Sequence, residues 1–313
     1  MRRTAVIASI LSLLLGCDKP ADEPAEPAVP LTDLSSAPTV LFQVFGPRQE
    51  PRAAPIAIVS GGTLRSITLD APGWRVLDSM VFSVGNRLSL YHRGADIGSA
   101  VVVRGMWPRD EEPLYSLPGC RTVVPQATLR LDATSRVEES VEFLASSALF
   151  AQPTESRPLP TNAESPGRTI ADATAAAAGI GKEDLAALDF HARWLRTGAG
   201  KEGRTLLASY VDPMAGDAGP GAGHTSNTFV LAEDSAGVFN TSYSHVVSGE
   251  ARSVEFMRLV NHADLDGDGV AEIVAEAWRY AGIPDLVLLK YADGRWRETV
   301  RISMDWCVQR DSR

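Results

Sequence analysis

One acidic stretch near the carboxyl end constrains this chain more than any other part of its sequence. Residues 264–272 read Asp-Leu-Asp-Gly-Asp-Gly-Val-Ala-Glu, with aspartates at every second position and glycines between them. Because glycine adopts positive φ angles, the stretch can turn tightly and aim its carboxylates at one centre. A hard cation suits such a centre, since calcium takes about six to eight oxygen ligands in flexible geometry. The sequence therefore predicts a calcium-binding loop.

The residues around this loop argue against a helix–loop–helix site. An EF-hand loop that began at Asp264 would end at Ala275, which has no carboxylate to offer. Glu272 is better placed to close the ligand shell, with Glu276 as a less favoured reserve. The flanking residues 255–260 and 273–278 alternate or run apolar, as strands do. We therefore expect an acidic hairpin loop between two strands.

The loop resembles the calcium loop of FG-GAP or VCBS-type repeats, in which an aspartate-rich hairpin joins two strands of a propeller blade. The resemblance covers one copy of the motif, and it implies oxygen ligands from Asp264, Asp266, Asp268, the Val270 backbone and Glu272. The alternative is a solvated acidic turn without an ion. Since like charges this close repel each other, we favour a bound calcium ion with a structural role.

The amino terminus reads as an export signal. Arg2 and Arg3 precede an apolar run at residues 5–15 that is too short to span a bilayer. The run ends in Leu-Leu-Gly-Cys at Cys17, which resembles a bacterial lipobox. The resemblance implies a signal peptide at residues 1–16, cleavage before Cys17 and acylation of Cys17. Several acyl chains hold a protein on a membrane far better than one. The alternative is an ordinary cleaved signal with an incidental cysteine.

Residues 17–38 are rich in proline, alanine and acidic residues, a composition that stays extended. We expect them to tether the folded part to a membrane of the cell envelope, facing the periplasm or the exterior. With Cys17 lipidated, Cys120 and Cys307 remain, and an oxidising compartment favours a disulfide between them. Two buried free thiols, or one thiol used in chemistry, are the alternatives.

The charge of the chain argues against nucleic acid as a partner. Its 30 Lys and Arg residues stand against 39 Asp and Glu residues, for a formal net charge of −9. An acidic surface repels the phosphate backbone.

The fold class predicted from the pattern is mainly β, with one or two short helices between two β-rich halves. Residues 39–151 hold short β-branched runs, among them a strand at 80–84, and end in a helix that begins at Ser135. A proline-rich linker at 152–167 separates them from residues 168–313. There we expect a helix at 169–178, a short helical piece at 182–187 and then an antiparallel meander. Its expected strands are 188–196, 204–211, 228–233, 238–247, 254–262, 271–280, 285–291 and 296–304. Propeller-like blades, an open sheet and a sandwich are all compatible with it.

Other motifs do not identify a reaction. Residues 198–203 match G-x-G-x-x-G, but a strand-like run follows where a dinucleotide site needs a helix, so we expect a flexible hairpin loop. There is no H-E-x-x-H, C-x-x-C or G-x-S-x-G motif. His262, just before the acidic loop, fits a packing role. We expect the glycine-rich residues 213–223 to form a mobile loop, with a lid over a pocket as the alternative.

The function expected from these features is that of a lipid-anchored envelope protein that binds a protein or glycan ligand. The alternatives are an exported, calcium-stabilised hydrolase of glycans or esters and a structural component of an envelope complex. For a hydrolase we expect two carboxylates or a Ser–His pair in a cleft near residues 213–224.

Overall fold

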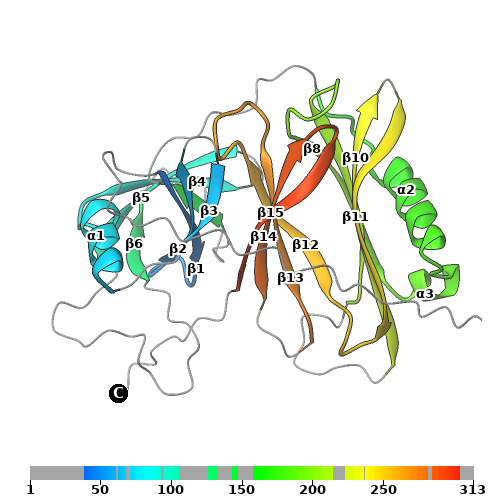
Figure 1. Cartoon of the computed structure of the whole chain (residues 1–313), viewed down its shortest axis with the longest axis horizontal. Helices are drawn as coiled ribbons and strands as arrows, with labels where there is room; N and C mark the ends of the chain where they lie inside the picture. The colour runs from blue at the N-terminus through cyan, green and yellow to red at the C-terminus, as the bar shows by residue number, and fades with distance from the viewer. Residues whose placement is uncertain are drawn as a thin grey trace, which may run out of the picture.

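The structure is a computed structural model that describes most of the chain from residue 39 onward. The described residues are 39–60, 63–67, 71–92, 95–105, 126–132, 143–146, 158–213, 223–235, 237–280 and 284–303. Within these ranges the chain forms fifteen strands and three helices. The prediction of a mainly β protein with antiparallel sheets and short helices is confirmed (Figure 1).

Seven strands of the first half form one sheet, called here the curled sheet, in the order β1-β7-β4-β5-β6-β2-β3. Because β1 also pairs with β2, the sheet curls back on itself into a half-barrel. Successive side chains of a strand point to opposite faces, and Val40, Phe42 and Val44 pack on the face that helix α1 (Ala71–Val81) covers. The strands are β1 (Thr39–Phe45), β2 (Arg52–Ser60), β3 (Thr63–Ser66), β4 (Arg87–His92), β5 (Ala95–Arg104), β6 (Ala127–Leu131) and β7 (Phe143–Ser146).

The strand expected at residues 80–84 is wrong, because these residues close helix α1 and lead into a turn. Leu77 and Val81 are one helical turn apart and are both buried in the core of the curled sheet. A helix places these two side chains on one face. A strand at 80–84 would put Phe82 and Val84 on one face, but Phe82 is buried and Val84 is 72% exposed. A short apolar run fits either a strand or a buried helix end, and periodicity alone does not separate them.

The helix expected from Ser135 onward is also wrong where the structure describes it. Residues 143–146 form β7, which pairs with β1 on one side and with β4 on the other. The hydrogen bonds offered by two neighbouring strands outweigh the helical spacing of the apolar residues, since propensity is a weak prior that tertiary context overrides. Ser135 itself lies outside the described residues.

The second half of the chain follows its predicted order of elements. The two expected helices are α2 (Glu164–Ala177) and α3 (Lys182–Ala186), and the last four residues of the expected linker at 152–167 belong to α2. All eight expected strands are present. They form two four-stranded antiparallel sheets, the outer sheet with order β11-β10-β9-β8 and the middle sheet with order β12-β13-β14-β15. The strands are β8 (Asp189–Arg196), β9 (Arg204–Val211), β10 (His224–Ser235), β11 (Val238–Glu250), β12 (Phe256–Ala263), β13 (Glu272–Trp278), β14 (Asp285–Ala292) and β15 (Arg295–Ser303).

The middle sheet lies between the outer sheet and the curled sheet (Figure 1). Ile273 and Leu289 pack in the core that the middle sheet shares with the outer sheet. Val274 and Leu288 pack in the core that it shares with the curled sheet. Burial on both faces explains why β13 and β14 read as nearly unbroken apolar runs rather than as an alternation. Helix α2 covers the opposite face of the outer sheet.

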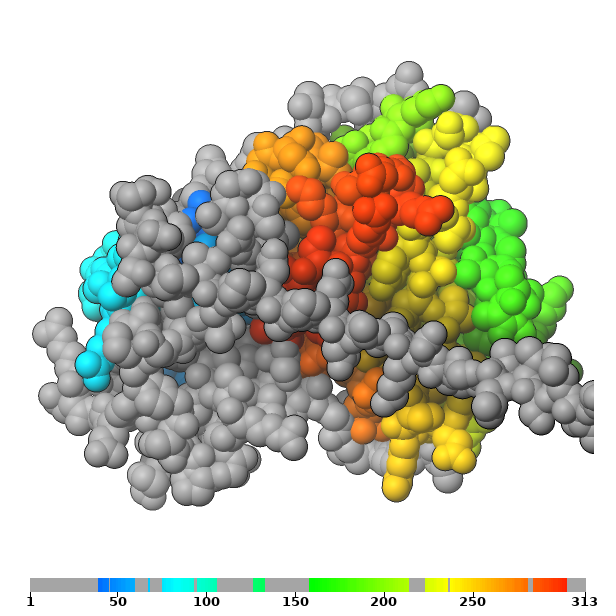
Figure 2. Space-filling view, in the orientation of Figure 1, coloured from blue at the N-terminus to red at the C-terminus, as the bar shows by residue number. Residues whose placement is uncertain are grey.

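The two halves of the chain thus share a core. Leu41, Ile56 and Tyr91 of the curled sheet belong to the same buried cluster as Val274 and other residues of the middle sheet. The side chain of Asn261 adds a buried hydrogen bond, from its Nδ2 to the carbonyl oxygen of Tyr91 at 2.8 Å. The last strand, β15, contacts β3 and β11, and Figure 2 shows its red residues at the surface beside the yellow residues of β11.

The expected signal peptide (1–16), the lipidated Cys17 and the tether (17–38) lie outside the described residues, as do Cys120 and Cys307. The anchor and the disulfide therefore stay predictions. In the part of the chain that the structure describes, no helix is both long and apolar enough to cross a membrane.

Candidate metal centre

The acidic stretch forms the loop between β12 and β13, as predicted. The two strands are antiparallel, and their last pair, Ala263 opposite Glu272, encloses residues 264–271. Strands on both sides bear out the case against an EF-hand, which needs helices there.

The aspartates fold the loop by accepting hydrogen bonds from its own backbone. The carboxylate of Asp264 accepts from the N–H groups of Gly267 at 2.8 Å and of Gly269 at 2.9 Å. The carboxylate of Asp268 accepts from the N–H of Val270 at 2.8 Å. Gly267 and Gly269 have φ angles of 83° and 86°, which residues with a Cβ rarely adopt. These bonds and turns bring the alternating carboxylates to one side.

The three aspartates meet closely enough to hold a metal ion. Asp264, Asp266 and Asp268 each offer one carboxylate oxygen, and these oxygens lie within 4.8 Å of one another. Calcium binds oxygen at about 2.3–2.6 Å, so two ligands on opposite sides of one ion stand about 5 Å apart. Asp264 and the side chain of Asp266 are fully buried, whereas the side chain of Asp268 is 41% exposed. The trio therefore has the spacing of a cation site with one open side.

Glu272 lies against this trio but also has a second role. It is buried, and its Oε2 accepts a hydrogen bond from the N–H of Leu265 at 2.8 Å, across the base of the loop. Burial raises the pKa of Glu272 to about 8, although the bond from Leu265 opposes the shift. Burial likewise raises the pKa of Asp264. The backbone oxygen predicted for Val270 stays a prediction, and the Val270 side chain packs against the core between the middle and outer sheets.

Lys290 is the residue of the site that the sequence did not reveal. It lies on β14, and its Nζ donates to Asp266 and, at 2.9 Å, approaches Asp268; Oε1 of Glu272 is 4.0 Å away. Burial lowers the pKa of Lys290, but the bonds to Asp266 and Asp268 outweigh it and raise the pKa above its usual value. The only signal in the sequence is a lysine inside the apolar run of residues 286–291. Its meaning depends on the pairing of β13 with β14, which places residue 290 beside Glu272.

A second hairpin packs directly on the metal loop. The N–H of Ala271 donates to the carbonyl oxygen of Thr197, the residue after β8, at 2.6 Å. Next to it, Gly198 has a φ of 77°, and a Cβ at this position would lie 2.4 Å from the carbonyl oxygen of Gly269. The G-x-G-x-x-G stretch at 198–203 is the predicted hairpin loop, but it is not simply flexible, because Thr197 and Ala199 are buried. Its first glycine permits this close approach.

A buried polar network continues from that hairpin into both sheets. The hydroxyl groups of Thr197 and Thr205 are 2.7 Å apart, and Thr205 lies 3.4 Å from Oε1 of Glu233 on β10. The same oxygen accepts a hydrogen bond from Nε1 of Trp296, on β15, at 2.7 Å. Buried polar groups are costly unless they are paired, so this network fixes one arrangement of the two sheets at the end where the metal loop sits.

His262 has the packing role expected of it. It is 5% exposed, and burial, with a contribution from the charge of Arg193, lowers its pKa to about 4. It is therefore a neutral side chain between the middle and outer sheets. A Ser–His pair does occur directly after residues 213–223 in the chain, since Nε2 of His224 and Oγ of Ser248 are 2.7 Å apart, but both side chains lie exposed on the outer sheet. Residues 214–222 lie outside the described residues.

Comparisons of the chain with protein-family models, with curated proteins and with solved structures give no match. Any function is therefore inferred from the residues of this chain.

Proposed function

We propose that the chain is an envelope-anchored binding protein whose β12–β13 loop is held by a structural calcium ion. The observation that carries the calcium proposal is the convergence of Asp264, Asp266 and Asp268 on one point, with two of the three side chains buried.

The charge at this point favours a divalent cation. Four carboxylates, those of the three aspartates and of Glu272, surround the single ammonium group of Lys290. A buried carboxylate is costly unless a positive charge or hydrogen bonds compensate it. One ammonium leaves part of the charge of the three aspartates uncompensated, whereas calcium adds two positive charges and would also favour the ionised form of Glu272, whose pKa burial raises. Oxygen-only ligands suit calcium or magnesium better than transition metals, and a ligand set from one irregular loop suits calcium, which tolerates flexible geometry.

The surroundings of the loop support a structural role for the ion. The loop packs on the hairpin at Thr197 and Gly198, next to the polar network that joins the outer and middle sheets. An ion at the three aspartates would stiffen the place where two hairpins from two sheets meet. A binding role for the protein as a whole is supported by the lipobox at Cys17 and the tether at 17–38, which present the folded part at a membrane.

Thermal unfolding with and without calcium tests the proposal. A ligand at about 100 times its Kd stabilises the folded state by about 2.7 kcal/mol, which raises Tm by about 4–5 °C for a chain of this size. We expect calcium to do so for the wild type and not for Asp266→Asn, which keeps the shape of the side chain but removes its charge.

The matched control is Asp293→Asn, at an aspartate that is 79% exposed in the β14–β15 turn. This variant should respond to calcium as the wild type does. A wild-type Tm that millimolar calcium leaves unchanged, together with no heat of binding, would show that the loop is a metal-free acidic turn.

The hydrolase alternative has one observation in its favour, the pair of His224 and Ser248 at 2.7 Å. A catalytic serine needs a base that is itself held by a third group, and both side chains here are exposed. Labelling with a fluorophosphonate probe decides the matter: modification of Ser248 in the wild type, lost in His224→Gln, would favour the hydrolase over the binding protein.

A further inference from the structure

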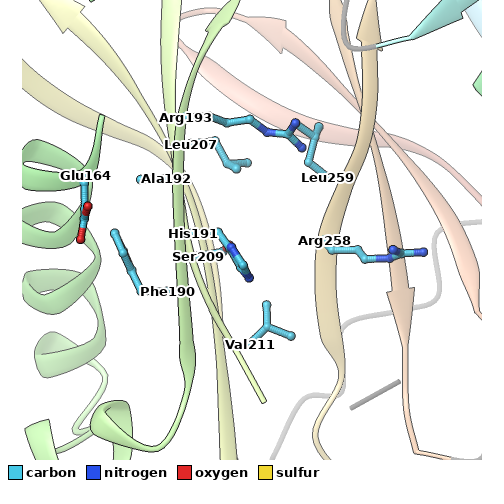
Figure 3. A pocket seen from close by; sticks show the side chains of 10 residues that line it. All are labelled: Glu164, Phe190, His191, Ala192, Arg193, Leu207, Ser209, Val211, Arg258 and Leu259. Carbon is cyan, nitrogen blue, oxygen red and sulfur yellow. The ribbon is translucent and has the colours of Figure 1, made fainter. Parts of the chain in front are cut away.

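The outer and middle sheets leave a cleft between them where β8 and β9 lie opposite β12. We call it the β8–β12 cleft, and it encloses a cavity of about 600 Å³, within the range of ordinary ligand pockets, about 300–1,000 Å³. Three alternate residues of β9, Leu207, Ser209 and Val211, line it and so share one face of the strand. Leu259 of β12 lines it from the other side (Figure 3). The cavity therefore lies over the face of the outer sheet that looks toward the middle sheet.

Two polar side chains lie next to each other on that face. His191 of β8 is directly opposite Ser209 of β9 in the register of the two strands. His191 points toward β12 (Figure 3), and Ser209 does so too, because directly opposite residues share a face. Ser209 is only 4% exposed, whereas His191 is exposed. The cleft thus has a buried hydroxyl in its floor and an imidazole at its mouth.

Neither of these two polar groups has a hydrogen-bond partner in the part of the chain that the structure describes. A buried hydroxyl without a partner is costly, so a ligand that exchanges a hydrogen bond with Ser209 gains what the fold leaves unused. Because Ser209 and His191 are not bonded to each other either, they are not arranged as the nucleophile and base of a hydrolase. The arrangement therefore favours binding.

The full charges around the cleft are already engaged. Glu164 of α2 pairs with Arg168. Arg258 points away from the cavity (Figure 3) and pairs with Glu276. Arg193, which lines the cleft from β8, also has an interaction partner. None of these charges is left for an ionic ligand, and an ion without an opposite charge is far more costly to bury than a neutral group.

The other side chains that face into the cleft are apolar. Leu207 and Leu259 also pack in the core between the two sheets, and Val211 packs against the cluster around Phe256. The fold therefore holds these walls in place without a ligand. Such a lining suits an apolar body, because ligand sites are mostly apolar with a few polar groups that fix orientation.

We propose that the β8–β12 cleft binds an uncharged small molecule that has an apolar body and a hydroxyl group. The body packs between Val211 and Leu259, and the hydroxyl lies between Ser209 and His191. A hydroxyl both donates and accepts, so it accepts a bond from Oγ of Ser209 and donates one to the unprotonated ring nitrogen of His191. The inference gives the proposed binding protein a class of ligand and so rests on the proposed function, but it requires neither the calcium ion nor the anchor.

Fluorescence titration of three related probes with the full chain tests the inference. The probes are 2-naphthol, naphthalene and 2-naphthoate, which share one apolar body and differ in the polar group. We expect 2-naphthol to bind about fivefold more tightly than naphthalene, the factor that one net hydrogen bond supplies. It should also bind more tightly than 2-naphthoate, whose charge has no partner in the cleft.

Two substitutions locate the bound hydroxyl. Ser209→Ala removes the buried hydroxyl, and His191→Phe keeps a ring but removes its nitrogens. Each should weaken the binding of 2-naphthol about fivefold and leave the binding of naphthalene unchanged. The matched control is Ser244→Ala, at an exposed serine on β11, two strands away from β9 in the outer sheet. It should bind all three probes as the wild type does.

Several results would overturn the inference. They are equal binding of 2-naphthol and naphthalene, binding of 2-naphthoate that is as tight as that of 2-naphthol, and an equal loss in Ser244→Ala. A loss in Ser209→Ala and His191→Phe that is the same for naphthalene as for 2-naphthol would also overturn it. So would displacement of 2-naphthol by cellobiose at the same concentration, which would identify a sugar site.

Each titration is run in EDTA and in calcium. If 2-naphthol binds in both while calcium leaves Tm unchanged, the calcium proposal alone fails. If calcium raises Tm but none of the probes binds, the ligand site alone fails.

Discussion

The role of a single residue in the metal loop depends on what surrounds it, and Lys290 shows this most clearly. The three aspartates could be predicted as ligands because they lie within five consecutive residues, so their spacing is visible in the sequence. Lys290 could not, since it is 24 residues from Asp266 and reaches it only through the register of β13 and β14. In the structure its ammonium group contacts Asp266 and Asp268, which are two of the three proposed calcium ligands. Lys290 and calcium must therefore compete.

Replacing this lysine should change stability in opposite directions with and without the ion. Without calcium, Lys290→Met leaves the buried Asp266 without its positive partner and lowers Tm. With calcium, the ion no longer has to displace a charged hydrogen bond worth about 1.5–3 kcal/mol, so affinity rises about tenfold or more. Calorimetric titration and thermal unfolding measure both effects. Lys182→Met, at an exposed residue of α3, is the control. An affinity equal to that of the wild type would refute the competition.

A second residue-scale prediction concerns acid stability. Burial raises the pKa of Asp234, but the hydrogen bond from Arg204, with the one from the N–H of Gly237, outweighs it and lowers the pKa below its usual value. The folded state thus favours the ionised form. The resulting stability is fully present above the unfolded pKa of about 4 and is lost as pH falls through the folded value.

Asp234→Asn should therefore cost about 1.5–3 kcal/mol at neutral pH, since asparagine keeps the acceptor for Gly237 but loses the charge that faces Arg204. As pH falls through the lowered folded pKa of Asp234, the wild type and the variant should converge. Urea unfolding at a series of pH values checks this, and a difference that does not change with pH would contradict it.

At the scale of helices and strands, the sequence predicted those elements whose conformation depends mainly on residues close together in the chain. The eight strands of the second half have clear periods and turn signals, and they lie where the sequence placed them. Helix α2 was also predicted, but it begins at Glu164, five residues before the expected start. Helix α1 and strand β7 were not predicted, because their short apolar runs fit either conformation and the curled sheet decides between them. The G-x-G-x-x-G stretch was assigned correctly to a hairpin. The packing of that hairpin on the metal loop could not be predicted, because it depends on how the β8–β9 pair of one sheet lies against the β12–β13 pair of another.

The contact between these two hairpins gives a prediction of its own. Gly198→Ala adds a Cβ that would lie 2.4 Å from the carbonyl oxygen of Gly269, in addition to the strain of a positive φ. Gly237→Ala, at a φ of 87° with nothing within 4 Å of the added Cβ, carries the backbone strain alone. In both variants the strain should lower the free energy of unfolding by about 1–2 kcal/mol. The close contact should lower it further in Gly198→Ala alone, and only that variant should bind calcium more weakly.

Unfolding curves and calcium titrations of the two variants separate the effects. If both variants bind calcium as the wild type does, the hairpin at residues 198–203 has no part in shaping the metal loop.

At the scale of the whole molecule, neither the layered order nor the shared core could be read from the sequence. One face of the middle sheet is covered by the outer sheet, and the other is covered because Val274 and Leu288 meet Leu41 and Ile56, from the other half of the chain. Such contacts join residues more than two hundred positions apart, and no local pattern encodes them. The nearly unbroken apolar runs of β13 and β14 indicate that these strands are buried on both faces, but they do not indicate which elements cover them.

The anchor is also a property of the whole molecule. If Cys17 is acylated, the wild type should partition with membranes and incorporate an alkyne-tagged fatty acid, whereas Cys17→Ser should do neither. Asp18→Ala, next to the same site, should keep the label. A wild-type protein that is recovered without the label from the aqueous fraction would show that the signal is an ordinary cleaved one.

A crystal structure of the full chain grown with calcium would decide whether the acidic loop holds the ion. We predict one ion within about 2.3–2.6 Å of oxygens from Asp264, Asp266 and Asp268, with the ammonium group of Lys290 displaced from Asp266. Lys290 still bonded to Asp266 and Asp268 in saturating calcium, with no ion between the three aspartates, would contradict it.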